Sequence, residues 1–223
     1  MDLKNQSISS ITFFEYRKGK RWWAFNQMQL AIKPLKNQEG ILFFKLMGTG
    51  GGFGFSLKPD FRTYCLFIVW KDPQSAKSYT QSEAYLHFNK NCKSNFTYWM
   101  GCIQSRGTWG GTNPLVDTFS YKTGPIMILT RARVNWSKIP RFLWHTPAAS
   151  RSLEGTEGLL FTKGIGEWPL IEQATFSFWE SAEHMKRYAY RKEHLEIVKK
   201  VKKEAWYKEE LFARFVPISP EGL

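Results

Sequence analysis

The chain contains the decapeptide Glu39-Gly40-Ile41-Leu42-Phe43-Phe44-Lys45-Leu46-Met47-Gly48 and, in its second half, the related decapeptide Glu157-Gly158-Leu159-Leu160-Phe161-Thr162-Lys163-Gly164-Ile165-Gly166. Both place Glu-Gly before an apolar run, a lysine within it and a glycine at its end. Downstream of each comes an apolar strand that ends in tryptophan, Leu66–Trp70 and Thr175–Trp179, and then a helical pattern. This shared order favours an internal duplication over chance likeness between two strand–helix pairs.

The segments upstream of the decapeptides also match. Ser10–Tyr16 and Ile126–Val134 have the β-branched and apolar content of strands, and each precedes a tryptophan-bearing segment, Trp22–Leu30 or Trp136–Trp144, that predicts a helix. The order β-α-β-β-α-β, twice over, predicts an α+β fold of tandem ferredoxin-like modules that form a dimeric α/β barrel-like arrangement within one chain. We place the modules at residues 1–118 and 119–223, because glycine and proline gather between Gly107 and Gly124.

Two such modules can bury their open sheet faces against each other. This arrangement predicts an enclosed apolar chamber, barrel-like in shape, that can hold a large ligand. The last predicted helix runs from Ser181 to about Lys203, with apolar residues at helical spacing, and Leu211–Val216 follows as a closing strand.

Charge limits the choice of partners. The formal net charge is +13, which favours a polyanion or an anionic membrane surface. Much of the excess lies between Lys186 and Lys203, where it is typical of the solvated face of a helix. The strands lack the aromatic-basic signature of RNA-binding sheets, so no nucleic-acid partner is expected.

The compartment is suggested by three further features. Residues Met1–Asn5 lack a basic region followed by an apolar core, so no signal peptide is expected. The longest apolar run, Cys65–Trp70, is far short of the roughly 20 residues that cross a bilayer. Three cysteines without CxxC spacing argue against a disulfide framework. We therefore expect a cytoplasmic protein, with peripheral contact at the inner membrane face left open.

The glycine-rich stretch Gly48–Phe55 follows a predicted strand. It lacks the lysine and the Ser or Thr that a phosphate-binding P-loop needs after its glycines. Gly52 permits close approach of a ligand to the backbone, and Phe53 and Phe55 offer that ligand an apolar surface. A bulged hairpin corner explains the same residues, and both interpretations stay open.

No pair of histidines has metal-binding spacing, but a haem iron needs only one protein ligand. His194 borders the apolar stripe of the last predicted helix, so it is our first candidate, and His145 is the reserve. A packing role for an inward histidine is the simpler alternative. His184 looks solvated, and the carboxylates Glu209 and Glu210 are interpreted as surface charge.

Longer strings carry a family resemblance. The run Gly40–Asp60, the run Gly158–Pro169 and the segment Ala174–Trp179 resemble the spheroidene monooxygenase family. The resemblance continues through Tyr188-Ala189-Tyr190, His194 and Trp206–Leu211 to Phe212–Phe215, and it covers about residues 11 to 215.

The resemblance implies an oxygenase that inserts oxygen at C–H bonds near the end of an acyclic carotenoid, with dioxygen and an electron donor as partners. Members are described as haem-dependent, and related dimeric α/β barrel proteins bind haem between sheet and helix. In this chain His194, or His145 in reserve, is then the expected iron ligand, and Arg133 or Arg191 the expected partner of a haem propionate. The expected walls of the substrate pocket are Gly52, Phe53, Phe55, Trp70, Trp144 and Trp179.

Two other functions fit the same residues. One is a cofactor-free α/β barrel oxygenase or isomerase, which would be active without colour. The other is a non-enzymatic carrier of haem or of an apolar ligand, which would bind tightly without turnover.

Overall fold

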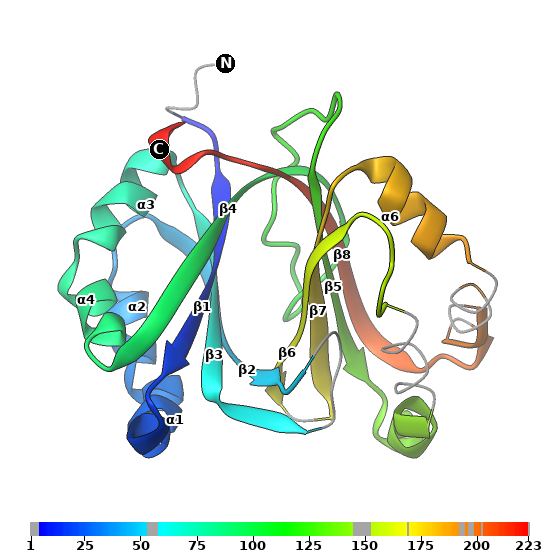
Figure 1. Cartoon of the computed structure of the whole chain (residues 1–223), viewed down its shortest axis with the longest axis horizontal. Coiled ribbons are helices and arrows are strands. Elements are labelled where there is room, and N and C mark those ends of the chain that lie inside the picture. Colours follow the sequence, from blue (N-terminus) through cyan, green and yellow to red (C-terminus); the bar gives the residue numbers. More distant parts are fainter. Residues whose placement is uncertain are drawn as a thin grey trace.

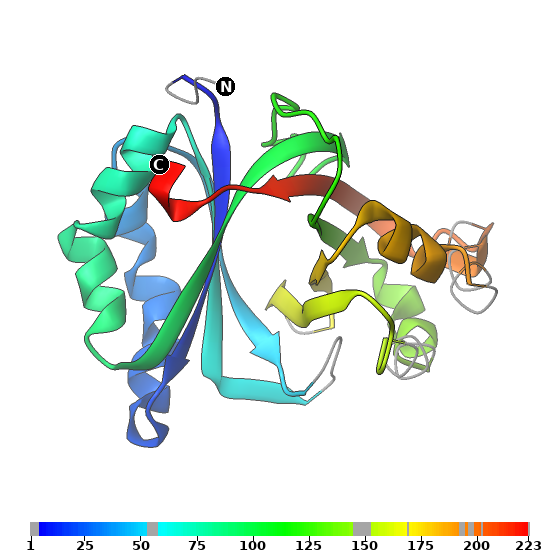
Figure 2. The same cartoon turned by 45° about the horizontal axis from the view of Figure 1, so that its top comes forward.

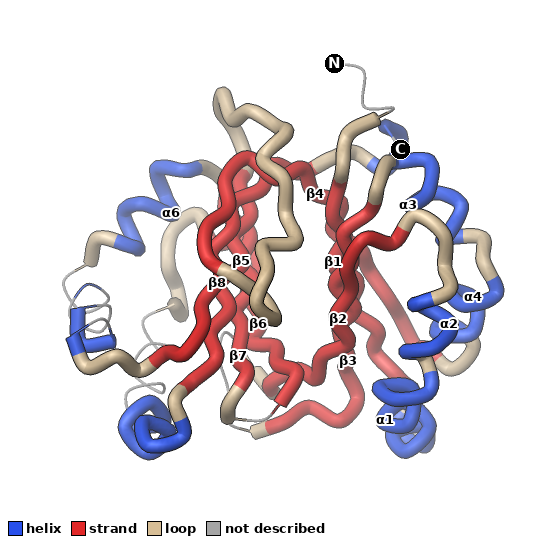
Figure 3. The backbone as a smooth tube through the Cα atoms, turned by 180° about the vertical axis from the view of Figure 1, so that it is seen from behind, coloured by secondary structure: helices blue, strands red, loops and turns tan. Residues whose placement is uncertain are grey.

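Eight antiparallel strands form a closed barrel in the order β1-β3-β2-β6-β7-β5-β8-β4, with helices on its outside (Figure 1). This computed structural model describes residues 5–52, 58–144, 153–168, 170–191, 195, 199–201 and 203–222. Seen from behind, the strands lie at the centre and helices flank them on both sides (Figure 3). The predicted α+β fold class is confirmed.

In its described residues the first half has four strands and four α-helices. The strands are β1 (Ile8–Tyr16), β2 (Ile41–Gly50), β3 (Pro59–Trp70) and β4 (Cys92–Gly107). A short 3-10 turn, η1 (Lys18–Lys20), leads into α1 (Arg21–Leu30) and α2 (Ile32–Lys36). The helices α3 (Pro73–Thr80) and α4 (Glu83–Asn89) connect β3 to β4 and begin at the capping side chains of Asp72 and Ser82.

The second half repeats the strand pattern. Its strands are β5 (Ile126–Val134), β6 (Leu159–Trp168), β7 (Glu172–Trp179) and β8 (Tyr207–Pro217). The 3-10 turn η2 (Trp136–Lys138) continues as helix over residues 139–144, and α6 (Ala182–Ala189) follows β7. A last 3-10 turn, η3 (Pro220–Gly222), lies near the C-terminus.

The last predicted helix is shorter than the sequence pattern suggests. Ser181 caps α6 as expected, its hydroxyl accepting from the His184 backbone N–H at 3.3 Å. The helix ends at Ala189, because Tyr190 leaves helical geometry and Arg191 forms a bend. The predicted helix from Ser181 to about Lys203 is therefore interrupted at Tyr190 and Arg191, and the chain is helical again at residues 195, 199–201 and 203.

Strand order shows the duplication directly. The order within the first half is β4-β1-β3-β2, and the second half repeats it as β8-β5-β7-β6. Trp70 lies opposite Ile8 and Ile41, as Trp179 lies opposite Ile126 and Leu159, so the two tryptophans are structural equivalents. Because all eight strands share one barrel, the division at residue 118 stays a prediction.

The repeated Glu-Gly has a steric origin. Gly40 and Gly158 both have positive φ, at 82° and 75°. A Cβ added to Gly40 would lie 2.2 Å from Ser75 at the start of α3, and one added to Gly158 would lie 2.2 Å from His184 in α6. Each glycine carbonyl also accepts a 2.8 Å hydrogen bond from the residue after the strand-ending tryptophan. Glycine is therefore required where a strand meets the first turn of the following helix.

The inside of the barrel is filled by side chains. Phe13, Phe67, Phe176 and Phe215 from both halves meet there in one buried cluster. Trp109, from the segment after β4, enters the same cluster and stacks on Phe67 at 5.5 Å. The expectation of an enclosed chamber between the two sheet faces is wrong, because large aromatic residues occupy the space that it would need.

Candidate functional site

The two halves differ on the outward face of the sheet, which the helices cover (Figure 2). In the first half this face carries large side chains that pack beneath α1, α3 and α4. The pairing registers align the halves residue by residue. At six outward positions a large residue of the first half is replaced by a small or polar one in the second: Phe14 by Ala132, Phe44 by Thr162, Leu46 by Gly164, Tyr64 by Gln173, Leu66 by Thr175 and Ile68 by Ser177.

We call these six residues of the second half the reduced face. Four of them, Ala132, Thr162, Gly164 and Ser177, are nevertheless buried. The Thr162 hydroxyl is buried and has no hydrogen-bond partner within the described part of the chain. Small side chains and an unpaired buried hydroxyl are typical of a surface that leaves room for another group.

A cleft of about 600 Å³ lies on the outward side of the sheet, near the strands β4 and β8. It lies between α6 and the sheet and is bounded by the linking segment that contains Tyr121. Met185 and Ile126 give it apolar walls, and its charged residues are two cations, Lys186 and Arg214, and two carboxylates, Asp117 and Glu183. The Tyr121 hydroxyl accepts from the Ala182 backbone N–H at 3.2 Å, which fixes the linking segment against the start of α6.

The structure separates the predicted aromatic walls. Trp179 is buried at the α6 end of the second half, where its ring lies 5.5 Å from Tyr188 and its indole N–H donates to Ser177. Trp70 occupies the equivalent place in the first half and donates to Ser10. Trp144 is 83% exposed. Only Trp179 of these three adjoins the reduced face.

The predicted polar contacts are also separated. Arg191 lies at the end of α6, with its guanidinium 3.4 Å from Thr156 and over the Tyr188 ring. Arg133 lies two residues after the inward Arg131, on the same face of β5, and pairs with Glu172 at 3.5 Å. Gly52 has a positive φ of 91°, and its carbonyl accepts from Lys163 at 3.4 Å.

Four of the predicted site residues lie outside the described residues. They are Phe53, Phe55, His145 and His194. Within the residues described, no cluster of three or more His, Cys, Asp or Glu side chains could hold a metal ion. A haem iron bound through one histidine does not need such a cluster.

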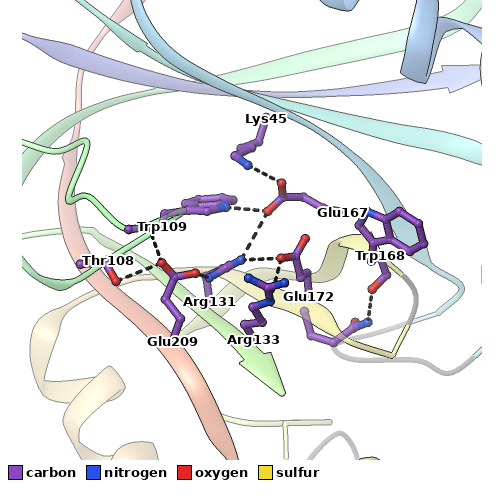
Figure 4. A network of polar contacts seen from close by, with 11 residues as sticks. Lys45, Thr108, Trp109, Arg131, Arg133, Glu167, Trp168, Glu172 and Glu209 are labelled. Atoms are coloured by element: carbon purple, nitrogen blue, oxygen red, sulfur yellow. Dashed lines mark hydrogen bonds and ion pairs between the residues drawn. The ribbon is translucent and has the colours of Figure 1, made fainter. Parts of the chain in front are cut away.

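A buried ion network, absent from the sequence-based expectations, closes the inside of the barrel where β6 ends and β7 begins (Figure 4). At its centre is Arg131, which is 2% exposed and pairs with Glu209, with Glu172 at 3.2 Å and with Glu167 at 3.8 Å. Lys45 and the Trp109 indole N–H complete the coordination of Glu167. Arg131 follows Met127 and Leu129 at a spacing of two, so the three residues share the inward face of β5. A charged residue in line with two apolar ones is the sequence signal that could have indicated this network.

Glu209 is therefore not the surface charge that the sequence suggested. Burial alone would raise its pKa, but hydrogen bonds from the Gly111 backbone, the Arg131 guanidinium and the Thr108 hydroxyl outweigh burial and lower the pKa of Glu209 to about 2. The network thus holds an ionised carboxylate and fixes the segment after β4 inside the barrel. His184 is likewise more buried than expected, because its ring packs on Gly158.

The fold is that of a dimeric α/β barrel formed by one chain, and the reduced face of its second half is the candidate site. Two aldoxime dehydratase structures have this fold; their TM-scores are 0.61 and 0.62, at 10% and 12% identity, with 99% of this chain and 82% and 83% of theirs aligned. At that identity the likeness shows the fold alone.

Proteins related in sequence identify the family more closely than the fold does. The chain is 30% identical to a spheroidene monooxygenase of Rhodobacter capsulatus, over 96% of this chain and 92% of that protein. It is 31% identical to those of Cereibacter sphaeroides and Rubrivivax gelatinosus, over 96% and 91% of this chain and 66% and 79% of theirs. No model of a known protein family matches the sequence. The chain belongs to the spheroidene monooxygenase family and is a monooxygenase of this type, as its sequence predicted.

Proposed function

We propose that this protein is a haem-dependent monooxygenase that inserts oxygen at C–H bonds near the end of an acyclic carotenoid. Dioxygen and an electron donor are its co-substrates in this proposal. Family membership supports the reaction class, and the names of the relatives support a carotenoid substrate. The observation that carries the location is the reduced face, where six large residues of the first half have small or polar counterparts.

The residues of the second half suit a flat apolar cofactor. Small residues such as Gly164 and Ala132 allow a planar group to approach the sheet. Their counterparts in the first half, Leu46 and Phe14, would block that approach. His194 is the proposed iron ligand and His145 the alternative. Arg191, at the end of α6, is better placed than Arg133 to pair with a propionate, because Arg133 pairs with Glu172 at the barrel end.

Bound haem would supply an iron that activates dioxygen. The chain's own residues have three tasks in this proposal. Trp179 and Tyr188 form an apolar wall that orients the substrate. The helices of the second half keep water from the reacting end, and the position of that wall decides which C–H bond is presented.

The absorption spectrum of the protein expressed with a supply of haem tests this proposal. We expect a Soret band and conversion of an acyclic carotenoid when dioxygen and a reductant are present. His194→Ala should abolish the Soret band and the conversion. The matched control is His87→Ala, because His87 lies in α4 of the first half and contacts Gln27 there.

Other outcomes would select another function. A colourless protein that still converts carotenoid would be a cofactor-free oxygenase or isomerase. Tight binding of haem or pigment without turnover would indicate a carrier. If neither His194→Ala nor His145→Ala alters the spectrum of the haem-loaded protein, both ligand assignments are wrong.

A further inference from the structure

Exposed aromatic side chains gather at one end of the barrel. The strands β1, β2, β5 and β6 all end there, and β3 and β7 begin there, at the bottom of Figures 1 and 3. The β2–β3 and β6–β7 corners meet at this end, since Gly48 pairs with Gly166. Six large apolar residues are exposed at these strand ends or in the segments next to them: Trp22, Phe25, Phe61, Trp136, Trp168 and Leu170.

Helix α1 shows most clearly that these residues are not part of the core. It buries only Ala24 and Gln27, while Trp22 is 78% exposed. The Trp22 and Phe25 rings contact each other edge to face at 6.1 Å, on the solvent side. Two exposed aromatic rings that contact each other on the solvent side are typical of an interaction surface rather than of a core.

Basic residues surround the N-terminus of α1. From Tyr16 to Gln38 the chain carries six Lys or Arg residues and no carboxylate. Of these, Arg17, Lys18, Lys20 and Arg21 are exposed and form no ion pair with any residue that the structure describes. Cations at a helix N-terminus oppose the helix dipole, so they do not stabilise α1.

We propose that this basic-aromatic end, comprising Arg17–Phe25 with Phe61, Trp136, Trp168 and Leu170, docks the protein on an anionic lipid surface. Tryptophan and phenylalanine insert at the headgroup level of a bilayer, and lysine and arginine bind anionic headgroups. A nucleic acid would engage the cations, but it would not require the exposed rings of four separate elements, α1, β3, η2 and β6. Within the described residues no helix is long and apolar enough to cross a membrane, so this contact is peripheral.

The docking end lies next to the reduced face, which suggests how the substrate reaches the candidate site. This step alone rests on the proposed function. Trp136 comes two residues after the end of β5, and β5, β6 and β7 carry the reduced face. Trp168 and Leu170 precede β7. A protein docked by this end would present the second half's sheet–helix layer to the bilayer, where an apolar carotenoid is dissolved.

Sedimentation with vesicles tests the docking without haem or carotenoid. The wild-type protein should sediment with vesicles of phosphatidylcholine and phosphatidylglycerol and much less with phosphatidylcholine alone. Lys18→Glu with Lys20→Glu should weaken binding at least tenfold, since each cation near an anionic surface contributes about fivefold. Trp22→Ala with Phe25→Ala should weaken it further at high salt, where the electrostatic part is screened.

Matched controls lie at the opposite end of the barrel. Lys71→Glu with Lys122→Glu makes the same charge change beside the end of β3 and before β5, and Leu42→Ala removes an exposed apolar side chain at the start of β2. These should leave vesicle binding unchanged. Thermal unfolding verifies that each variant is folded.

Equal losses in the test and control charge variants would overturn the proposal in favour of diffuse attraction. Binding to heparin that matches vesicle binding, and that is indifferent to Trp22→Ala with Phe25→Ala, would identify a polyanion site instead. Because no cofactor is present, a protein that docks but does not oxidise carotenoid contradicts only the proposed function.

Discussion

Single glycines decide where a strand and its helix meet in each half. Gly158 combines a positive φ with a space that the His184 ring already occupies. Gly155 has a positive φ of 66° but no atom within 4 Å of an added Cβ. A substitution at Gly155 therefore tests backbone strain alone, whereas one at Gly158 tests backbone strain together with a steric clash.

Gly158→Ala should destabilise the protein more than Gly155→Ala. The left-handed backbone alone costs about 1–2 kcal/mol in either variant. The clash with His184 adds about 1–3 kcal/mol at residue 158 only, as overpacking does elsewhere. Urea unfolding of both variants measures the difference. Equal losses would mean that α6 moves away freely and that the close approach is not required.

Glu209 gives a pH-dependent prediction. Its folded pKa, about 2, lies below the usual value of 4.5, so the ionised form stabilises the native state above about pH 4.5. That stabilisation is lost as the pH falls from about 4.5 towards 2. Glu209→Gln should therefore cost on the order of 2 kcal/mol at pH 7, and the cost should shrink in acid.

Thermal unfolding of wild type and Glu209→Gln between neutral pH and acid follows this difference. Glu210→Gln is the control, because Glu210 is the exposed neighbour on the opposite face of β8. A constant difference at all pH values would show that Glu209 acts by packing rather than by charge.

At the scale of elements, the strands that flank the two decapeptides are predictable, because each has an apolar pattern that ends in tryptophan. Ile126–Val134 agrees with β5 at both ends. Strand β4 is not recognisable in the same way. Its first five residues after Cys92 are mostly exposed and polar, and only their pairing with β1 makes them a strand.

The reduced face was open to prediction from the aligned repeats, because Leu46 and Gly164 are aligned within the decapeptides themselves. Which of the two faces those residues occupy follows only from the pairing registers. The ion network was not predictable, since Lys45, Arg131 and Glu209 are far apart in sequence and meet only in the closed barrel.

Restoring first-half residues to the reduced face should block the site without unfolding the protein. Gly164→Leu with Thr175→Leu copies Leu46 and Leu66 of the first half. If this face holds a cofactor, haem uptake should fall at least tenfold while the thermal midpoint of the haem-free protein stays within a few degrees. A solidly packed face would instead lose about 1–3 kcal/mol of stability through overpacking.

On the scale of the whole molecule, the barrel core belongs to neither half. Phe13 and Phe67 come from the first half, and Phe176 and Phe215 from the second, yet they form one cluster. The two seams between the halves are unequal. Strands β4 and β8 pair over a long register, whereas β2 and β6 share only two pairs, Gly48 with Gly166 and Thr49 with Ile165.

The predicted division at residue 118 can be tested by expressing residues 1–118 and 119–223 as separate chains. Each half alone would expose the inner face of its sheet, which the intact barrel buries, so neither should show a cooperative unfolding transition. Mixed together, they should form a one-to-one complex, because the long β4–β8 seam and the shared aromatic core reassemble without a covalent link. A cut after Leu129, inside β5, is the control, since it interrupts the pairing of β5 with β7 and β8 and should prevent assembly. A first half that folds alone as a stable monomer would show that its helix-covered aromatic cluster suffices for folding, and that the barrel interior is not the shared core that its composition indicates.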